Sequence, residues 1–197
     1  MKTKQIQLIF VCIGNRNRSP FSQFLFDKMM GEKDKDIVGL VEVASAGFVP
    51  QALKDIVAQF NVGFPEPFFN RPIAEMTRRI LHQKDITVPS EWRTKELTPG
   101  MVEEANLIIT ALPIQKRELL MLFPKAEGKI FSLREMAAWD KHLVLEDFVE
   151  PPKDGDYWHY LEENPEYVTK ILSETEDLLM HGYPRIIERL RHDRSAI

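Results

Sequence analysis

The chain has a single cysteine, Cys12, among its 197 residues. One thiol excludes an internal disulfide framework and is typical of a protein kept in a reducing compartment, so we expect a cytoplasmic location. Long hydrophobic runs are also missing: the apolar stretch near the N-terminus is too short for a transmembrane helix and lacks a small-residue cleavage site. We therefore expect no membrane as a partner.

An excess of positive charge is missing as well. The chain has 26 Lys and Arg against 30 Asp and Glu, a formal net charge of −4, which supplies no general reason to expect nucleic acid as a partner. Hydrophobic residues make up 44% of the sequence, enough to bury one sizeable core. Without repeats, low-complexity segments or a linker, residues 1–197 are predicted to form a single domain.

Apolar runs alternate with amphipathic segments along the chain. Strands are predicted at 6–11, 40–44, 107–111 and 129–132, with Ser45-Ala46-Gly47 ending the second. Helices are predicted at 19–30, from Pro72, after Pro99, from Pro113, and at 165–191, the last one kinked or divided at Gly182-Tyr183-Pro184. Residues 191–195 are expected to form a solvated tail. Repeated βα units predict an α/β fold, a four-stranded parallel sheet with helices on both faces.

The connection between the first strand and the first helix carries the chemistry. It runs from Cys12 to Ser19, with Ser19 expected as the N-cap and Pro20 as the first helical residue. This loop lies at the carboxyl end of a strand, where open α/β sheets bind ligands, and its N–H groups and the helix N-terminus form an anion cradle. A thiolate beneath a bound oxyanion would attack phosphorus or arsenic. The alternative is a buried structural cysteine beside a turn.

Residue types within the loop suit this chemistry. The planar guanidinium of Arg18 can clamp two oxygens of the anion, a task that lysine performs poorly. Asn15 tolerates the left-handed backbone that tight anion nests require. Arg16 adds a second cation at the rim. The residues expected to contact the phosphate through this loop are Ile13, Gly14, Asn15, Arg16 and Asn17.

These residues resemble the low-molecular-weight protein tyrosine phosphatase family and its related arsenate reductases. The pattern Cys-x-Gly-Asn-x-x-Arg-Ser-Pro is met by Cys12, Gly14, Asn15, Arg18, Ser19 and Pro20. Segments 43–47, 85–93 and 105–110 are similar to later family segments, with Trp92 in place of a histidine, so the resemblance spans about residues 6 to 152. It implies a flavodoxin-like topology. It also implies hydrolysis of a phosphotyrosine-like monoester through a cysteinyl-phosphate, without metal or organic cofactor.

The resemblance also implies roles for residues along the chain. Ser19 would donate its hydroxyl to the sulfur, Ser45 would reach Asn15, unless it is only a turn residue, and Phe48 would flank the substrate. The general acid of the family is an aspartate before proline, and Glu150 aligns with it. Its rivals are Asp147, Asp154 and Asp156. An extra methylene shifts the carboxyl of a glutamate, and a shift of roughly 1 Å can cost ~100-fold in rate.

Departures from the family leave two alternatives open. Asn17 stands where many relatives have a second cysteine, so the protective disulfide within the loop is not expected. The three-cysteine relay of the thioredoxin-coupled arsenate reductases is impossible because the chain has only one cysteine. A single-cysteine arsenate reductase that uses an external small thiol is the first alternative. The second is a phosphate- or phosphoprotein-binding module that has lost the acid. Ligands expected in all three cases are phosphorylated proteins or small molecules and inorganic phosphate or other oxyanions. Insertions near 49–69 and 153–167 lengthen the chain and are expected to be surface loops.

Overall fold

The computed structural model describes residues 5–59, 67–138 and 164–194. Its strands are β1 (Ile6–Cys12), β2 (Val41–Gly47), β3 (Leu107–Thr110) and β4 (Ile130–Ser132). Its helices are α1 (Arg18–Lys33), α2 (Gln51–Gln59), α3 (Glu75–Gln83), α4 (Pro99–Glu104), α5 (Pro113–Leu122), α6 (Leu133–Ala137) and α8 (Pro165–Arg194), with a short 3-10 turn, η1, at Pro124–Ala126.

All four strands are parallel and follow the order β2-β1-β3-β4. Strand β1 lies inside the sheet and pairs with β2 from Ile6 opposite Val41 to Cys12 opposite Gly47. The single-domain α/β fold with a four-stranded parallel sheet is thereby confirmed. The register places the nucleophile candidate directly beside Gly47 at the carboxyl end of the sheet.

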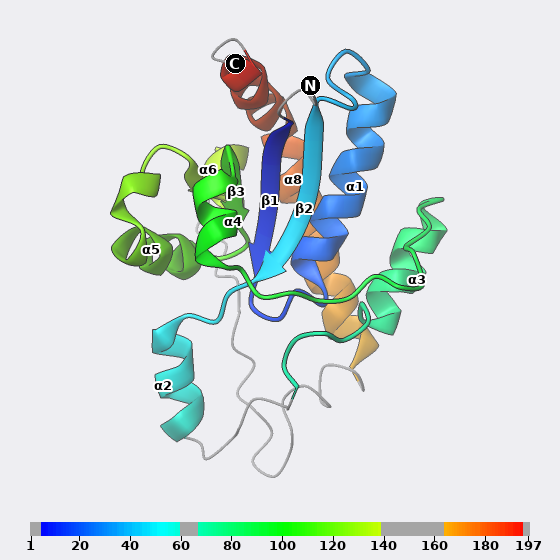
Figure 1. Cartoon of the computed structure of the whole chain (residues 1–197). Helices are drawn as coiled ribbons and strands as arrows, with labels where there is room; N and C mark the ends of the chain where they lie inside the picture. The colour runs from blue at the N-terminus through cyan, green and yellow to red at the C-terminus, as the bar shows by residue number, and fades with distance from the viewer. Residues whose placement is uncertain (1–4, 60–66, 139–163, 195–197) are drawn as a thin grey trace.

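Helices cover both faces of the sheet, as predicted (Figure 1). Because side chains alternate along a strand, Leu8 and Phe10 of β1 join a core with α1, α3 and α8. Ile9 and Val11 point to the other face and pack with α4 and α5. Burial of β1 on both faces explains its continuous apolar sequence.

The C-terminal helix α8 differs from its prediction. It is one helix over Pro165–Arg194 with Pro184 inside it, so the predicted division at residues 182–184 is wrong, while the alternative of a kink stays a prediction. Buried residues before and after the proline, such as Leu179 and Ile186, pack into the core that α8 shares with α1. Interior proline costs about 3 kcal/mol, and burial of several large side chains on one helix outweighs it.

The end of α8 is not the predicted solvated tail. Arg191 lies within the helix and pairs with Asp34 and Asp36 at 2.9 Å each. These two acids follow the C-terminal end of α1. The charged end of α8 therefore contacts a neighbouring element through exposed ion pairs, and not solvent alone.

Several predicted boundaries are also corrected. Strand β2 continues through residues 45–47, because pairing with β1 extends to Cys12. Helix α1 begins at Arg18 with Asn17 as its N-cap, so Ser19 is not the cap and Pro20 is the third helical residue. Helix α3 begins three residues after Pro72. Helices α2 and α6 were not predicted, and α2 lies within the predicted 49–69 insertion, which is therefore not only a surface loop. Residues 153–163 of the second insertion lie outside the described residues.

None of the described helices is both long enough and apolar enough to cross a membrane.

Candidate active site

Cys12 is the last residue of β1 and is 3% exposed. Its carbonyl accepts a hydrogen bond from the Phe48 N–H at 2.8 Å, which holds the start of the loop against the chain that leaves β2. Six residues later Arg18 opens α1, half-buried. Since the first N–H groups of a helix have no partner within it, the loop and the start of α1 present donors to an anion at this edge.

Ser19 lies against Cys12. Its Oγ is 3.0 Å from Cys12 Sγ and 3.2 Å from the Ala46 carbonyl. The Asn15 side-chain amide donates to the same hydroxyl oxygen at 2.9 Å, so the Ser19 hydrogen is left for the sulfur or the Ala46 carbonyl. A hydroxyl that donates to sulfur stabilises a thiolate and its departure from phosphorus.

Asn15 holds the loop in shape. It is fully buried and has a φ of 54°, in the left-handed region. Its amide nitrogen donates to Ser19 Oγ and to Ser45 Oγ, each at 2.9 Å, and its carbonyl accepts from the Lys95 N–H at 3.0 Å. Three contacts to three segments satisfy the buried amide and maintain the positive φ. The structure thus brings together Cys12, Asn15, Ser19 and Ser45.

Sequence reasoning missed two members of this network. The Ser45 hydroxyl donates to Gln23 Oε1 at 2.6 Å, and Gln23 in turn donates to the Val43 carbonyl at 3.2 Å. Gln23 lies four residues after Ser19 on α1, and this i, i+4 spacing places both polar side chains on the same face of the helix. That spacing was a usable signal. Nothing near Lys95 in the sequence indicated that its backbone would bind Asn15.

The other side of the loop is attached to α3. Thr77, fully buried, donates to Asn17 Oδ1 at 2.6 Å, and the Ala74 N–H donates to the Arg16 carbonyl at 3.1 Å. Arg16 and Asn17 are both half-buried. Where relatives were expected to have a cysteine, this chain therefore has an amide that ties the loop to a helix 60 residues away in sequence.

Apolar residues close the remaining side. Ile13 is buried in a small cluster with Leu53 and Leu112, against which Phe68 packs. Phe68 stacks edge-on with Phe69 at 4.9 Å between ring centres. Gly14 is buried. The Phe48 side chain packs into the core formed with α4 and α5, so its contact with substrate stays a prediction.

Gly47 leaves room where the loop and an aromatic ring approach β2. A Cβ atom at this position would lie 2.7 Å from the Ile13 carbonyl oxygen and would overlap the Phe69 ring. Glycine is required here because the backbone and the ring approach so closely, and its φ is not positive. The Ser-Ala-Gly segment thus ends on a residue whose missing side chain lets the loop pack.

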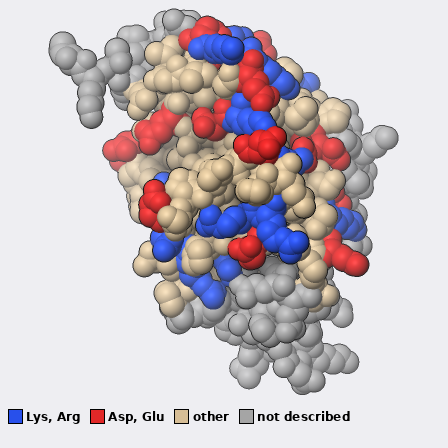
Figure 2. Space-filling model, turned by 90° about the vertical axis from the view of Figure 1, so that its right-hand side faces the viewer, with Lys and Arg blue, Asp and Glu red and all other residues tan. Residues whose placement is uncertain are grey.

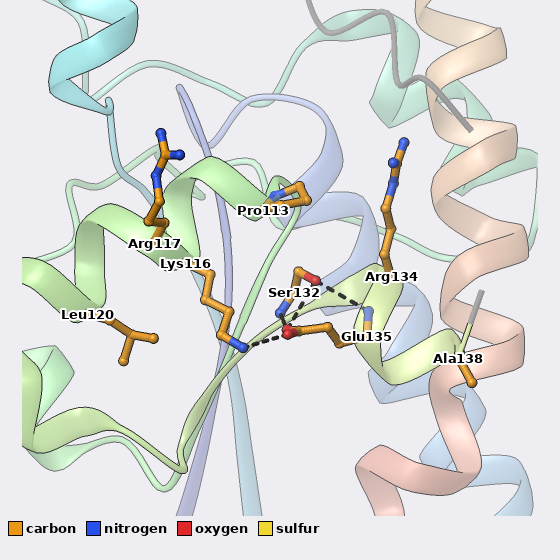
Figure 3. A pocket seen from close by; sticks show the side chains of 8 residues that line it. All are labelled: Pro113, Lys116, Arg117, Leu120, Ser132, Arg134, Glu135 and Ala138. Atoms are coloured by element: carbon orange, nitrogen blue, oxygen red, sulfur yellow. Dashed lines mark hydrogen bonds and ion pairs between the residues drawn. The ribbon is translucent and has the colours of Figure 1, made fainter. Parts of the chain in front are cut away.

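A separate hollow of about 610 Å³ lies between α5 and α6 (Figure 3). Lys116 pairs with Glu135 across it, and Glu135 also accepts from the Ser132 N–H at 2.7 Å. Burial alone would raise the pKa of Glu135, but hydrogen bonds from Lys116 and Ser132 outweigh it and lower the pKa. Arg134 points away from this pair (Figure 3). The hollow is a structured corner at the end of β4 and contains no residue of the Cys12 loop.

The proposed acids follow α6 in the sequence. Glu150 and its rivals Asp147, Asp154 and Asp156 fall in residues 139–163, outside the described residues. The described chain stops at Ala138, just after α6, which directly follows the carboxyl end of β4. Among the described residues, no group of three or more His, Cys, Asp or Glu could hold a metal ion.

Comparison with known proteins identifies this arrangement. Residues 7–192 match the family model described as "Low molecular weight phosphotyrosine protein phosphatase". The chain belongs to this family. A relative named "Probable low molecular weight protein-tyrosine-phosphatase EpsP" from Ralstonia solanacearum is 33% identical over 133 residues, which cover 68% of this chain and 74% of that protein. Family membership makes the protein a cysteine-dependent phosphatase that hydrolyses phosphoesters.

Solved structures share the fold at lower identity. The YwlE arginine phosphatase from Geobacillus stearothermophilus superposes with a TM-score of 0.62 at 21% identity, covering 95% of this chain and 97% of that one. A YwlE variant with a phosphorylated active-site serine gives a TM-score of 0.63 at 22% identity, covering 94% and 99% of the two chains. Wzb from Vibrio vulnificus, in complex with benzylphosphonate, gives 0.54 at 16% identity, covering 91% and 98%.

Proposed function

We propose that this phosphatase hydrolyses phosphotyrosine-like monoesters of proteins or small molecules through a cysteinyl-phosphate intermediate on Cys12. The observation that carries the proposal is the 3.0 Å contact from Ser19 Oγ to Cys12 Sγ, inside a hydrogen-bond network whose bonds from Asn15 to Ser19 and Ser45 are buried. A cysteine that only packed in the core would not need such a network, because burying polar groups costs free energy unless each is paired. The network orients a donor towards a sulfur that becomes negatively charged.

The reaction has two displacements. The Cys12 thiolate attacks phosphorus, the S–P bond forms, and the bond to the ester oxygen breaks while Glu150 gives that oxygen its proton. Water then attacks phosphorus, Glu150 takes a proton from it, and the S–P bond breaks to release phosphate and thiolate. Ser19 stabilises the departing thiolate.

Charge on the phosphoryl oxygens is met by the loop. Arg18 and the N–H groups of residues 13–17 would contact the equatorial oxygens, and Asn15 holds these groups in place before substrate arrives. Donors that are already oriented need no reorganisation as the transition state forms, and this is usually the largest electrostatic contribution to catalysis.

The first test is hydrolysis of p-nitrophenyl phosphate from pH 4 to 8 by the wild type, Cys12→Ser and Glu150→Gln. We expect Cys12→Ser to lose on the order of 10⁴-fold or more in kcat. Glu150→Gln should remove the high-pH limb of the profile, while Asp147→Asn leaves it in place. Rapid-quench labelling with a phosphotyrosine peptide should trap phosphate on wild-type protein and none on Cys12→Ser.

Two experimental outcomes would contradict the proposal and support one of the alternatives. Turnover of arsenate that depends on added small thiol, without hydrolysis of p-nitrophenyl phosphate, would make the protein a single-cysteine arsenate reductase. Binding of phosphate or vanadate without turnover of either substrate would make it a binding module. We expect the enzyme to act in the cytoplasm, where a single reduced thiol is maintained.

A further inference from the structure

We propose that this phosphatase prefers peptide segments with acidic residues beside the phosphorylated residue, and that Arg71, Arg93 and Lys95 recognise those acids. These three residues are called the basic rim. The inference rests on the proposed function, because it names the substrate class of the same loop.

The basic rim is built onto the loop by backbone hydrogen bonds. The Lys95 N–H donates to Asn15 Oδ1 at 3.0 Å, and the Lys95 carbonyl accepts from the Gly47 N–H at 2.8 Å. Thr94 joins Arg71 to this segment, with its N–H 2.8 Å from the Arg71 carbonyl and its hydroxyl 2.9 Å from the Arg71 N–H. All three cations therefore belong to two paired segments that adjoin the loop and the end of β2.

The rim charges are uncompensated within the part of the chain that the structure describes. Arg93 and Lys95 are exposed and Arg71 is half-buried, and none of them pairs with a carboxylate among residues 5–59, 67–138 and 164–194. Arg93 donates only to the neutral carbonyls of Ser90 and Trp92, each at 2.8 Å. By contrast, Lys84 pairs with Glu176 at 2.7 Å.

Charge is unevenly distributed over the molecule. Residues 14–18 and 67–98 hold eight Lys or Arg against four Asp or Glu, although the whole chain has a net charge of −4. Figure 2 shows Lys and Arg gathered in the lower half of the face that carries α3, whereas both signs alternate over the upper half. A local excess of positive charge around a concave site attracts anionic substrates and raises their association rate.

The spacing of the rim fits an extended peptide. Thr94 is buried and its neighbours Arg93 and Lys95 are exposed, so the two cations lie on the same side of an extended segment. Side chains two positions apart along such a segment repeat every ~6.6 Å, which is also the repeat of alternate side chains in an extended ligand. Acids at alternate positions beside a phosphorylated residue would match these cations. A single small phosphoester occupies only the loop.

The test compares two phosphotyrosine peptides that differ only in flanking Glu or Gln, with p-nitrophenyl phosphate as the baseline. At low salt we expect kcat/KM to be about tenfold higher for the Glu peptide than for the Gln peptide, since each exposed charge pair contributes about threefold. Salt at 0.5 M should largely remove this difference. Lys95→Glu should lower the ratio of kcat/KM for the Glu peptide to that for the Gln peptide about tenfold, because it replaces attraction with repulsion. The variant with Arg71→Glu, Arg93→Glu and Lys95→Glu should invert the preference.

The matched control is Lys125→Glu. Lys125 is exposed on η1, before β4 and therefore at the opposite end of the sheet, so the ratio should equal that of the wild type. If the enzyme hydrolysed p-nitrophenyl phosphate but had equal kcat/KM for the two peptides, the proposal for the basic rim would be wrong and the proposed function would stand. The proposal for the basic rim would also be wrong if the preference survived Lys95→Glu in protein with an unchanged circular dichroism spectrum. Failure to hydrolyse p-nitrophenyl phosphate would instead overturn the proposed function.

Discussion

The two ends of the sheet are held together by different kinds of polar contact. At the carboxyl end Asn15, fully buried, joins the loop to α1, β2 and the segment at Lys95 through neutral hydrogen bonds. At the amino end Tyr183 donates to Asp34 at 2.6 Å, and Arg191, 46% exposed, pairs with the same carboxylate at 2.9 Å. One network is dry and neutral, and the other is charged and open to water.

The difference follows from what each end has to hold. The loop keeps a residue at positive φ, so it needs contacts that cannot exchange with solvent. Helix α8 is already held by its apolar face, so exposed ion pairs at its end add little. Substitutions at the carboxyl end should therefore affect activity and stability together, whereas those at the amino end should affect stability alone.

The largest effect is expected for Asn15→Ala. It removes the amide that donates to Ser19 and Ser45, leaves the Lys95 N–H without its acceptor, and places alanine at a φ of 54°. We expect a loss of about 3 kcal/mol in the free energy of unfolding, measured by urea denaturation, and at least a hundredfold lower kcat. The control at the other end is Asn106→Ala, which removes one bond to the Gln7 N–H and should cost about 1 kcal/mol with unchanged kcat. If Asn15→Ala and Asn106→Ala lowered kcat equally, the proposed difference between the two ends of the sheet would be wrong.

Gly47→Ala should come next. The new methyl meets the Ile13 carbonyl, which is backbone and cannot rotate away. Overpacking of this kind costs about 2 kcal/mol and should displace the start of the loop, lowering kcat with p-nitrophenyl phosphate. Gly128→Ala is a poor control because its φ is 89°, so Gly31→Ala in α1, with open space around it, is the matched variant and should retain full activity.

Thr77→Val should have a smaller effect with a clear direction. It removes the donor to Asn17 Oδ1 while retaining the shape of a buried side chain, so the loop loses its tie to α3. We expect about 1 kcal/mol of lost stability and a several-fold lower kcat. Thr175→Val, in α8, removes only a bond to the Ile171 carbonyl of its own helix and should leave kcat unchanged. A kcat equal to that of the wild type for Thr77→Val would show that the loop does not need this tie.

The smallest effect is expected for Tyr183→Phe at the amino end, about 1 kcal/mol of stability with no change in kcat. Burial, and then the hydrogen bond to Asp34, raise the pKa of Tyr183 above its ordinary value of 10.0. Because the folded-state pKa is raised, the contribution is fully present below about pH 10 and is lost as the pH rises further. The difference in Tm between wild type and variant should therefore shrink above pH 10. If the difference in Tm grew above pH 10, it would contradict a raised pKa for Tyr183 in the folded protein.

Parts of the fold with strong local signals were predictable. The continuous apolar run before Cys12 predicted β1, and the prolines at Pro99 and Pro113 marked the first residues of α4 and α5. The boundaries that failed depended on distant partners: β2 is extended by pairing with β1, and α8 continues through Pro184 because its apolar face is buried. Propensity describes one segment at a time, and such partners are invisible to it.

The amino-acid sequence by itself determined the chemistry of the site. The spacing of Cys12, Asn15, Arg18 and Ser19 within one strand-to-helix loop is local, so a short segment is enough to predict a thiol, a cation and amides close together. Only the tertiary structure decided what holds this loop: Gln23, Thr77 and the backbone of Lys95 reach it from other elements. Hydrogen bonds between segments far apart in the chain depend on how the helices pack on the sheet, and that packing leaves no mark in the spacing of the residues that form them.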